Sequence, residues 1–167
     1  MSSQGKAVVA PRPRIGAHVP TSGGMAKRSI EYAQTIKAEA IQVFASNPRG
    51  WAMPDPNPDA DAAFREKAIA MDIETYIHSP FLVNLGSPNP STYENSVAAT
   101  AYALRRGRDI GALGVVVHTG SAVDEGHVAA AWKQITKGVM PILESLKESD
   151  PMLLLEPTAG QGQSLVK

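Results

Sequence analysis

The 167-residue sequence contains no cysteine. Disulfide bonds and thiolate metal sites are therefore excluded, so any bound metal must be held by histidine and carboxylate side chains. The sequence also lacks a long apolar run, because no stretch approaches the roughly 18 residues of a membrane span. Residues 1–14 lack the apolar segment of a secretory signal as well. We therefore expect no contact with a membrane and a cytoplasmic location.

Net charge and phosphate-binding glycine motifs are absent too. The 16 Lys and Arg residues balance 16 Asp and Glu residues, which argues against a protein that coats nucleic acid nonspecifically. Gly23-Gly24 has neither the dinucleotide-binding nor the P-loop spacing. A hydrophobic content of 43% and a length of 167 residues fit one globular domain.

Short apolar stretches alternate with helical patterns along the whole chain, and prolines and glycines separate them. Residues 1–14, which contain two prolines, are expected to form a flexible arm. The predicted strands are residues 15–19, 40–44, 74–78, 115–117 and 152–156. The predicted helices are residues 25–36, 59–71, 92–113, with Gly114 as the stop, and 125–148. This alternation predicts a parallel sheet with helical connections.

Polar side chains stand at the ends of the last three predicted strands. His78 and His118 end the third and fourth strands, and Glu156 ends the fifth. Met152 to Leu155 are all apolar, so we expect a strand covered on both faces, and a carboxylate that leaves it must be paired, protonated or bound to a metal. Because successive strands contribute these groups, a (β/α) barrel is favoured over an open doubly wound sheet.

Structural roles are the alternative for each of these residues. A single histidine at a strand end is more often hydrogen-bonded within the fold than a ligand, but two histidines and a glutamate at equivalent ends match a three-ligand zinc centre. His18, in the first strand, either lines this site or bonds a neighbouring loop. Asn47, Arg49 and Trp51 lie in a proline-rich stretch, residues 46–58, that is either a rigid exposed loop or a binding element.

Six stretches together resemble the endonuclease IV-type apurinic/apyrimidinic (AP) endonucleases in order and spacing. They are IGAHV at 15–19, Gly23-Gly24, QVFASNPRGW at 42–51, HSPFLVNLGSP at 78–88, VVVHTGS at 115–121 and LLLEPTAGQG at 153–162. The similarity covers nearly everything after Arg14. It implies a TIM barrel with a trinuclear zinc site that hydrolyses the phosphodiester 5′ to an abasic site in duplex DNA and leaves a 3′-hydroxyl.

The resemblance also implies roles for individual residues. His78, His118 and Glu156 are similar to metal ligands of the family, and Glu156 is similar to the catalytic-site carboxylate that bridges two metals. The DNA-binding residues implied are Asn47, Arg49 and Trp51, in the loop that probes the minor groove, and Phe81, where relatives often have tyrosine.

The sequence departs from the family at its end, because later strands of the family supply further ligands and this sequence stops at Lys167. We expect residues 15–167 to be the N-terminal portion of one barrel, with about five strands and four helices, that binds one zinc ion and has little endonuclease activity. The complete protein is expected to be a monomer and the fragment to self-associate. A sugar isomerase or epimerase of the xylose isomerase-like barrels, and a noncatalytic half-barrel interaction module, are the alternative functions.

Overall fold

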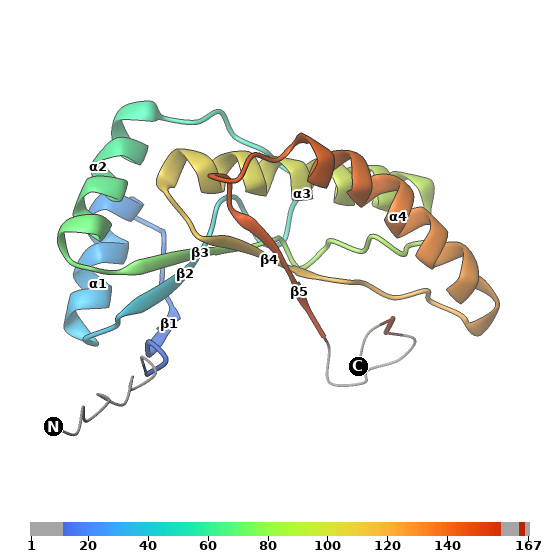
Figure 1. Cartoon of the computed structure of the whole chain (residues 1–167), viewed down its shortest axis with the longest axis horizontal. Helices are drawn as coiled ribbons and strands as arrows, with labels where there is room; N and C mark the ends of the chain where they lie inside the picture. The colour runs from blue at the N-terminus through green and yellow to red at the C-terminus, as the bar shows by residue number, and fades with distance from the viewer. Residues whose placement is uncertain (1–11, 158–163, 166–167) are drawn as a thin grey trace, which may run out of the picture.

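The computed structural model describes residues 12–157 and 164–165 of the chain. Its centre is a five-stranded sheet in which all neighbouring strands are parallel and follow the order of the sequence (Figure 1). The strands are β1 (Gly16–His18), β2 (Ala40–Phe44), β3 (Glu74–His78), β4 (Gly114–His118) and β5 (Met152–Glu156). Parallel neighbours in sequence order need a crossover after each strand, which is the connectivity of a (β/α) barrel wall.

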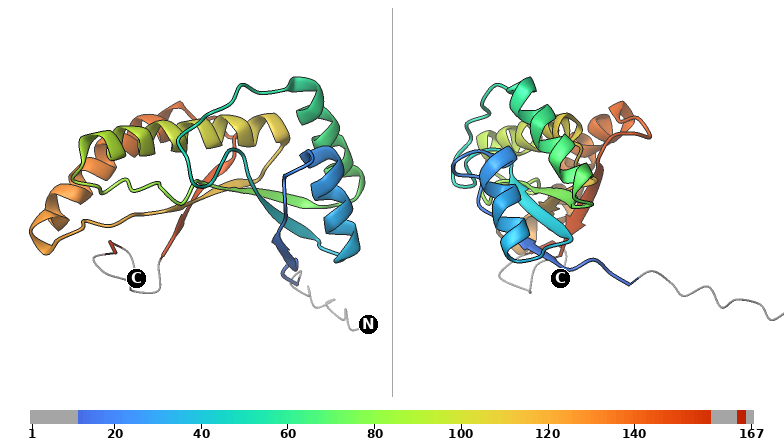
Figure 2. Two further views of the ribbon diagram at one scale, coloured as in Figure 1. Left: turned by 180° about the vertical axis from the view of Figure 1, so that it is seen from behind. Right: turned by 90° about the vertical axis from the view of Figure 1, so that its left-hand side faces the viewer.

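The helices cover one face of this sheet, as Figures 1 and 2 show from opposite sides. They are α1 (Ile30–Thr35), α2 (Pro58–Ala70), α3 (Pro90–Ile110) and α4 (Val128–Ser145). A π-helical turn (Met25–Ser29) precedes α1, and a 3-10 turn (Glu125–His127) precedes α4. The predicted fold class, an incomplete α/β barrel of five strands and four helices, is confirmed. None of the helices in the described part of the chain is long and apolar enough to cross a membrane.

An Asn-Pro pair begins both α2 and α3. The side-chain Oδ1 of Asn57 accepts a hydrogen bond from the amide of Ala60 (3.1 Å), and Oδ1 of Asn89 accepts one from the amide of Thr92 (3.0 Å). The proline that follows each asparagine occupies a helical position where its missing N–H is not needed. These caps fix where the loops after β2 and β3 end, and both loops carry predicted site residues.

The predicted ends of the third and fourth helices are wrong. α3 ends at Ile110, and Gly111 follows with φ 72°, a left-handed conformation that glycine adopts without strain. Gly114 instead begins β4, where a Cβ atom would lie 2.6 Å from Cδ1 of Leu154. α4 is shorter than the predicted residues 125–148, because residues 125–127 form the 3-10 turn and the helix ends at Ser145.

The core lies between the sheet and the helices. Alternate residues of the three central strands are completely or almost completely buried, as expected for side chains on the helix-covered face. These strand residues are Ile41, Val43, Ile77, Val115 and Val117. Phe64 of α2 and Leu104 of α3 cover them from the helical layer. This packing makes the central strands a rigid support for the side chains at their carboxyl ends.

β5 contradicts the prediction that both of its faces are covered. Met152 is 59% exposed and Leu155 is 57% exposed. Within the described residues β5 pairs with β4 alone, so it is an edge strand with few neighbours to bury its side chains. Apolar composition therefore predicted the strand correctly but not its burial.

Residues 12–14 of the predicted flexible arm belong to the described part of the chain, and its flexibility stays a prediction. Residues 1–11 lie outside the described residues. Nη1 of Arg12 donates to Oε2 of Glu39 at 2.8 Å, and Nη2 of Arg14 donates to Oδ1 of Asp72 at 2.8 Å. Acidic side chains just before β2 and β3 thus hold this part of the chain against the amino end of the sheet.

Candidate metal centre and adjoining loops

His78, His118 and Glu156 occupy the carboxyl ends of β3, β4 and β5. In the strand register His118 lies directly opposite Glu156, whereas His78 lies opposite Val116, two residues before His118. Side chains two residues apart in a strand lie on the same face. The register therefore places all three predicted ligands on one face at one edge of the sheet.

The three side chains converge. Nε2 of His78 is 3.2 Å from Oε2 of Glu156, and Nε2 of His118 is 3.7 Å from the same oxygen. One ligand atom from each of the three residues lies within 4.8 Å of the other two. Ligand atoms about 2.0–2.1 Å from a tetrahedral zinc ion are about 3.3 Å apart, which is close to the two distances from Oε2 of Glu156.

Hydrogen bonding decides which imidazole nitrogen of His78 is free. Nδ1 of His78 lies 2.6 Å from the carbonyl oxygen of Ser79, and since a carbonyl can only accept, Nδ1 carries the proton. In the neutral ring Nε2 then presents a lone pair to the carboxylate of Glu156. Two acceptors at 3.2 Å repel unless a cation or a proton lies between them. The donor set of two imidazoles and one carboxylate fits zinc with one open coordination position.

Aromatic rings surround the buried side chain of His78. Its ring centroid is 5.1 Å from that of His118, 5.6 Å from that of Phe44 and 5.7 Å from that of Phe81. Phe44, at the carboxyl end of β2, was not among the predicted site residues. Its position directly opposite His78 in the register is the signal that could have identified it.

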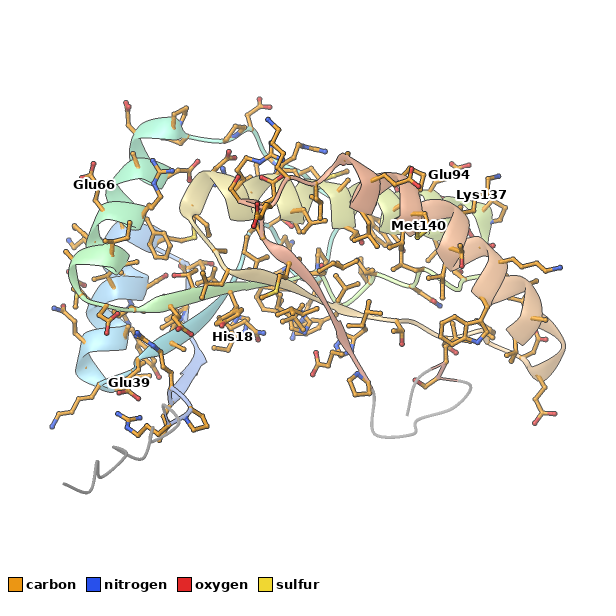
Figure 3. The ribbon with its side chains drawn as sticks, in the orientation of Figure 1. His18, Glu39, Glu66, Glu94, Lys137 and Met140 are labelled. Carbon is orange, nitrogen blue, oxygen red and sulfur yellow. The ribbon has the colours of Figure 1, made fainter. Side chains whose placement is uncertain are left out.

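His18 lies beside this cluster and not among the converging ligand atoms. Its ring is 4.4 Å from the ring of Phe44, and its Nδ1 is 3.0 Å from Oε1 of Gln42 in the neighbouring strand. Figure 3 shows the labelled His18 on the side of the sheet away from α3 and α4. Of the two roles considered for His18, a bond to a neighbouring loop is not observed within the described residues, because Gln42 lies in β2, and the side chain flanks the site at Phe44.

The segment that joins β2 to α2, residues 45–57, contains the proline loop (residues 46–57) and has no regular helix, as predicted. Oδ1 of Asn47 accepts a hydrogen bond from the amide of Arg49 (3.0 Å), so Asn47 shapes the turn. Trp51 is half-buried and packs against the core. The guanidinium of Arg49 is exposed and has no partner within the described residues. Of the predicted DNA-contacting residues in this loop, Arg49 alone projects a free charged group.

A hydrogen bond joins the proline loop to the loop after β3. The amide of Phe81 donates to the carbonyl oxygen of Pro48 at 2.9 Å. The side chain of Phe81 is 56% exposed, and its ring packs edge-on against Phe44 at 5.1 Å. Arg49, Phe81 and the three converging ligand groups therefore belong to one continuous rim.

Comparison with known families agrees with this fold. The profile of the family described as "Xylose isomerase-like TIM barrel" matches residues 30–167 of the chain. The structure of an L-ribulose 3-epimerase is also similar, with a TM-score of 0.67 over 93% of this chain and 53% of that one, but at 15% identity it supports the fold alone. The chain belongs to the xylose isomerase-like TIM barrel family.

Within this family the chain is of the endonuclease IV type, and the resemblance noted in the sequence is confirmed. A protein of Streptomyces coelicolor named "Probable endonuclease 4" is 49% identical over 166 residues, which are 99% of this chain and 56% of that protein. The crystal structure of endonuclease IV from Thermus thermophilus has a TM-score of 0.73 and 33% identity, over 92% of this chain and 55% of that one. The chain thus spans about half the length of the relatives that it matches.

Proposed function

We propose that this chain provides zinc ligands and lesion-contacting loops of a DNA repair endonuclease that hydrolyses the phosphodiester 5′ to an abasic site in duplex DNA. The observation that carries the proposal is the convergence of two imidazole nitrogens and one carboxylate oxygen within 4.8 Å, on the same rim as Arg49 and Phe81. Relatives named as endonucleases support the reaction class. We also propose that this chain corresponds to the N-terminal part of such an enzyme and that the reaction depends on zinc.

The residues of the candidate metal centre would hold zinc through Nε2 of His78, Nε2 of His118 and a carboxylate oxygen of Glu156. Bound zinc stabilises negative charge that develops on a phosphate and lowers the pKa of an attacking water. The carbonyl of Ser79 keeps the Nδ1 proton on His78 and so directs Nε2 toward the site. Phe44 and Phe81 pack against the ring of His78.

The adjoining loops would contact the DNA. Arg49 offers an unpaired guanidinium for phosphate or a base edge. Phe81 offers an exposed ring, and a ring that fills the space of a missing base gains a stacking contact that undamaged DNA does not provide. Since the chain has no net charge, binding would depend on this local arrangement and not on overall attraction to DNA.

The test is nicking of a duplex that contains one abasic analogue, with zinc supplied, by this chain and by a relative of full family length. We expect the relative to cut 5′ to the lesion and to lose activity when its equivalents of His78 and His118 are replaced by alanine. For this chain we expect zinc binding in a ratio of about one ion per chain, measured by elemental analysis after dialysis, and little nicking.

Three results would contradict the proposal. A folded chain without zinc would remove the metal centre. Equal binding of abasic and undamaged duplexes would leave the noncatalytic interaction module as the better description. Zinc-dependent epimerisation of a ketose by the full-length relative, without nicking, would favour the sugar epimerase alternative.

A further inference from the structure

The second half of the proline loop has few means of attachment. Residues 52–57 are all exposed. Pro54 and Pro56 have no N–H, so they cannot donate a backbone hydrogen bond. Among the described residues, the one hydrogen bond made by residues 51–56 is accepted by the carbonyl of Pro54. Trp51 packs against the core at the start of this segment, so a donor from elsewhere that reaches one of the later carbonyl groups adds a second attachment.

That donor is the hydroxyl of Tyr102, in the middle of α3. Tyr102 is 8% exposed, and its hydroxyl donates to the carbonyl oxygen of Pro54 at 2.9 Å. The carbonyl of Ala45, directly after β2, lies 3.5 Å from the same hydroxyl, beyond the usual range for a strong O–H···O bond. Burial raises the pKa of Tyr102, so the hydroxyl keeps its proton at neutral pH.

The next turn of α3 fixes the far end of the loop. Arg106 is 7% exposed, and both of its terminal nitrogens donate to the carboxylate of Asp61 in α2, each at 2.6 Å. Asp61 lies in the first turn of α2, directly after the loop. One face of α3 therefore holds both the loop and the helix into which it leads.

We propose that Tyr102 is a positioning residue that fastens the proline loop and so holds Arg49 at the rim of the candidate metal centre. The loop is bound at Pro48 by the amide of Phe81 and at Pro54 by Tyr102, so Arg49 lies between the two ties. Tyr102 itself is buried, so it would act on DNA binding through the loop. Its effect on DNA binding rests on the proposed function, whereas the fastening of the loop does not.

The test is Tyr102→Phe, which removes the hydroxyl and keeps the ring. Trp51 reports on the loop, and Trp132→Phe in all proteins makes Trp51 the single tryptophan. We expect Tyr102→Phe to raise acrylamide quenching of Trp51 by about twofold, because an unfastened loop opens more often. Unchanged quenching would overturn the proposal.

Tyr93→Phe is the matched control. Tyr93 lies on the same helix, and its hydroxyl donates to a backbone carbonyl, that of Gln134 in α4, at 3.1 Å. The two substitutions remove the same kind of hydrogen bond, but only one of these bonds reaches the proline loop. An equal rise in Trp51 quenching in both variants would show a general loss of stability and would also overturn the proposal.

Measurement of DNA binding separates two claims: that Tyr102 fastens the proline loop, and that the fastened loop supports DNA binding. We expect Tyr102→Phe to weaken binding of an abasic duplex about fivefold, the loss of one ordinary hydrogen bond, and Tyr93→Phe to leave it unchanged. If Tyr102→Phe raises the quenching of Trp51 but the unaltered chain binds no DNA, the fastening of the loop is supported and the proposed function is contradicted. If neither variant folds, NMR of the unaltered chain decides: a Tyr102 hydroxyl proton in slow exchange and close to Pro54 is expected, and its absence overturns the proposal.

Discussion

The two ends of the sheet carry polar side chains in opposite arrangements. At the amino end, Arg14 binds Asp72 at 2.8 Å and Glu74 at 3.0 Å, and Arg12 binds Glu39. Every charge of this group has a partner of opposite sign. At the carboxyl end, two imidazoles and one carboxylate converge without an arginine or lysine among them.

This difference separates a structural cluster from a candidate site. Ion pairs that neutralise each other are complete without a ligand, and their effect is to hold segments together. Two acceptors that face one another, as Nε2 of a neutral His78 and Oε2 of Glu156 do, are stable only when a proton or a cation lies between them. We therefore expect substitutions in paired clusters to change stability and substitutions in the open cluster to change ligand binding.

The largest loss of stability is expected from Arg106→Ala. Arg106 and Asp61 form the most deeply buried ion pair of the described residues, with side chains 8% and 5% exposed. Removing the arginine leaves a buried carboxylate without its partner, which costs about 3–5 kcal/mol of unfolding free energy. Urea unfolding measures this loss. Arg12→Ala, which breaks an exposed pair with Glu39 (side chains 69% and 35% exposed), serves as the control and should cost much less.

Zinc binding by Arg106→Ala tests whether the converging ligand groups are independent of the buried ion pair. The folded variant should bind zinc with unchanged affinity, because Arg106 contacts none of the converging ligand groups. A large loss of zinc affinity in the folded variant would mean that the paired clusters and the open cluster are not separable.

Glu156→Gln is expected to lower zinc affinity and to leave the stability of the metal-free chain unchanged or higher. It replaces a charged ligand by a neutral amide of the same shape, and zinc affinity should fall by at least about 100-fold, since even groups behind metal ligands contribute 10–100-fold. Stability without metal should stay the same or rise, because the amide NH₂ can donate to Nε2 of His78. Calorimetric titration with zinc and thermal unfolding in chelator measure the two effects. Glu39→Gln is the control that should leave zinc binding unchanged.

The sequence predicted the fold well where a local signal was strong. Alternating strand and helix patterns gave all five strands to within a residue or two, and the ends of β3, β4 and β5 gave the three converging side chains. The ends of the helices were predicted less well, because Gly111 and Gly114 are the same residue type three positions apart. The structure distinguishes them by the φ of 72° at Gly111 and by the close approach of Leu154 to Gly114.

Roles that depend on a distant partner could not be predicted. Asn47 and Arg49 are both polar loop residues in the sequence, and only the hydrogen bond from the Arg49 amide shows that Asn47 shapes the turn. In the sequence Tyr102 is one residue of a long predicted helix. Its role could not be predicted, because its partner Pro54 lies 48 residues away. The exposure of β5 also depends on how many strands flank it, which its apolar composition does not encode.

Arg49→Ala and Phe81→Ala test whether the free groups of the carboxyl rim read a lesion. Each should weaken binding of abasic DNA by a full-length protein by about 1–3 kcal/mol, the range for a stacking contact, and should weaken binding of undamaged DNA less. Fluorescence anisotropy with matched duplexes measures the difference. Arg65→Ala, which removes an exposed arginine of α2, is the control for charge alone. Equal losses on both duplexes would make Arg49 a phosphate contact without lesion preference.

The smallest expected effect is a pH dependence at the amino end of the sheet. Hydrogen bonds from Arg12 and from the amide of Ile15 lower the pKa of the Glu39 carboxyl from 4.5 to about 2. A carboxyl whose pKa is lower in the folded state stabilises the fold above its unfolded value, and this contribution is lost as pH falls from about 4.5 through about 2. Because Arg12 and Glu39 are exposed, the stabilisation is modest and is screened by salt.

Glu39→Gln should remove this contribution and leave the rest of the acid titration in place. The Tm of the unaltered chain should therefore exceed that of the variant at pH 7, and the two values should converge as pH falls toward 2. Glu31→Gln, at an exposed carboxyl of α1, is the control and should follow the unaltered chain throughout. Thermal unfolding at low salt between pH 2 and pH 7 measures these curves. Parallel curves for Glu39→Gln and the unaltered chain would show that the Arg12 pair contributes nothing to stability, and that pairing at the amino end is a surface contact without energetic weight.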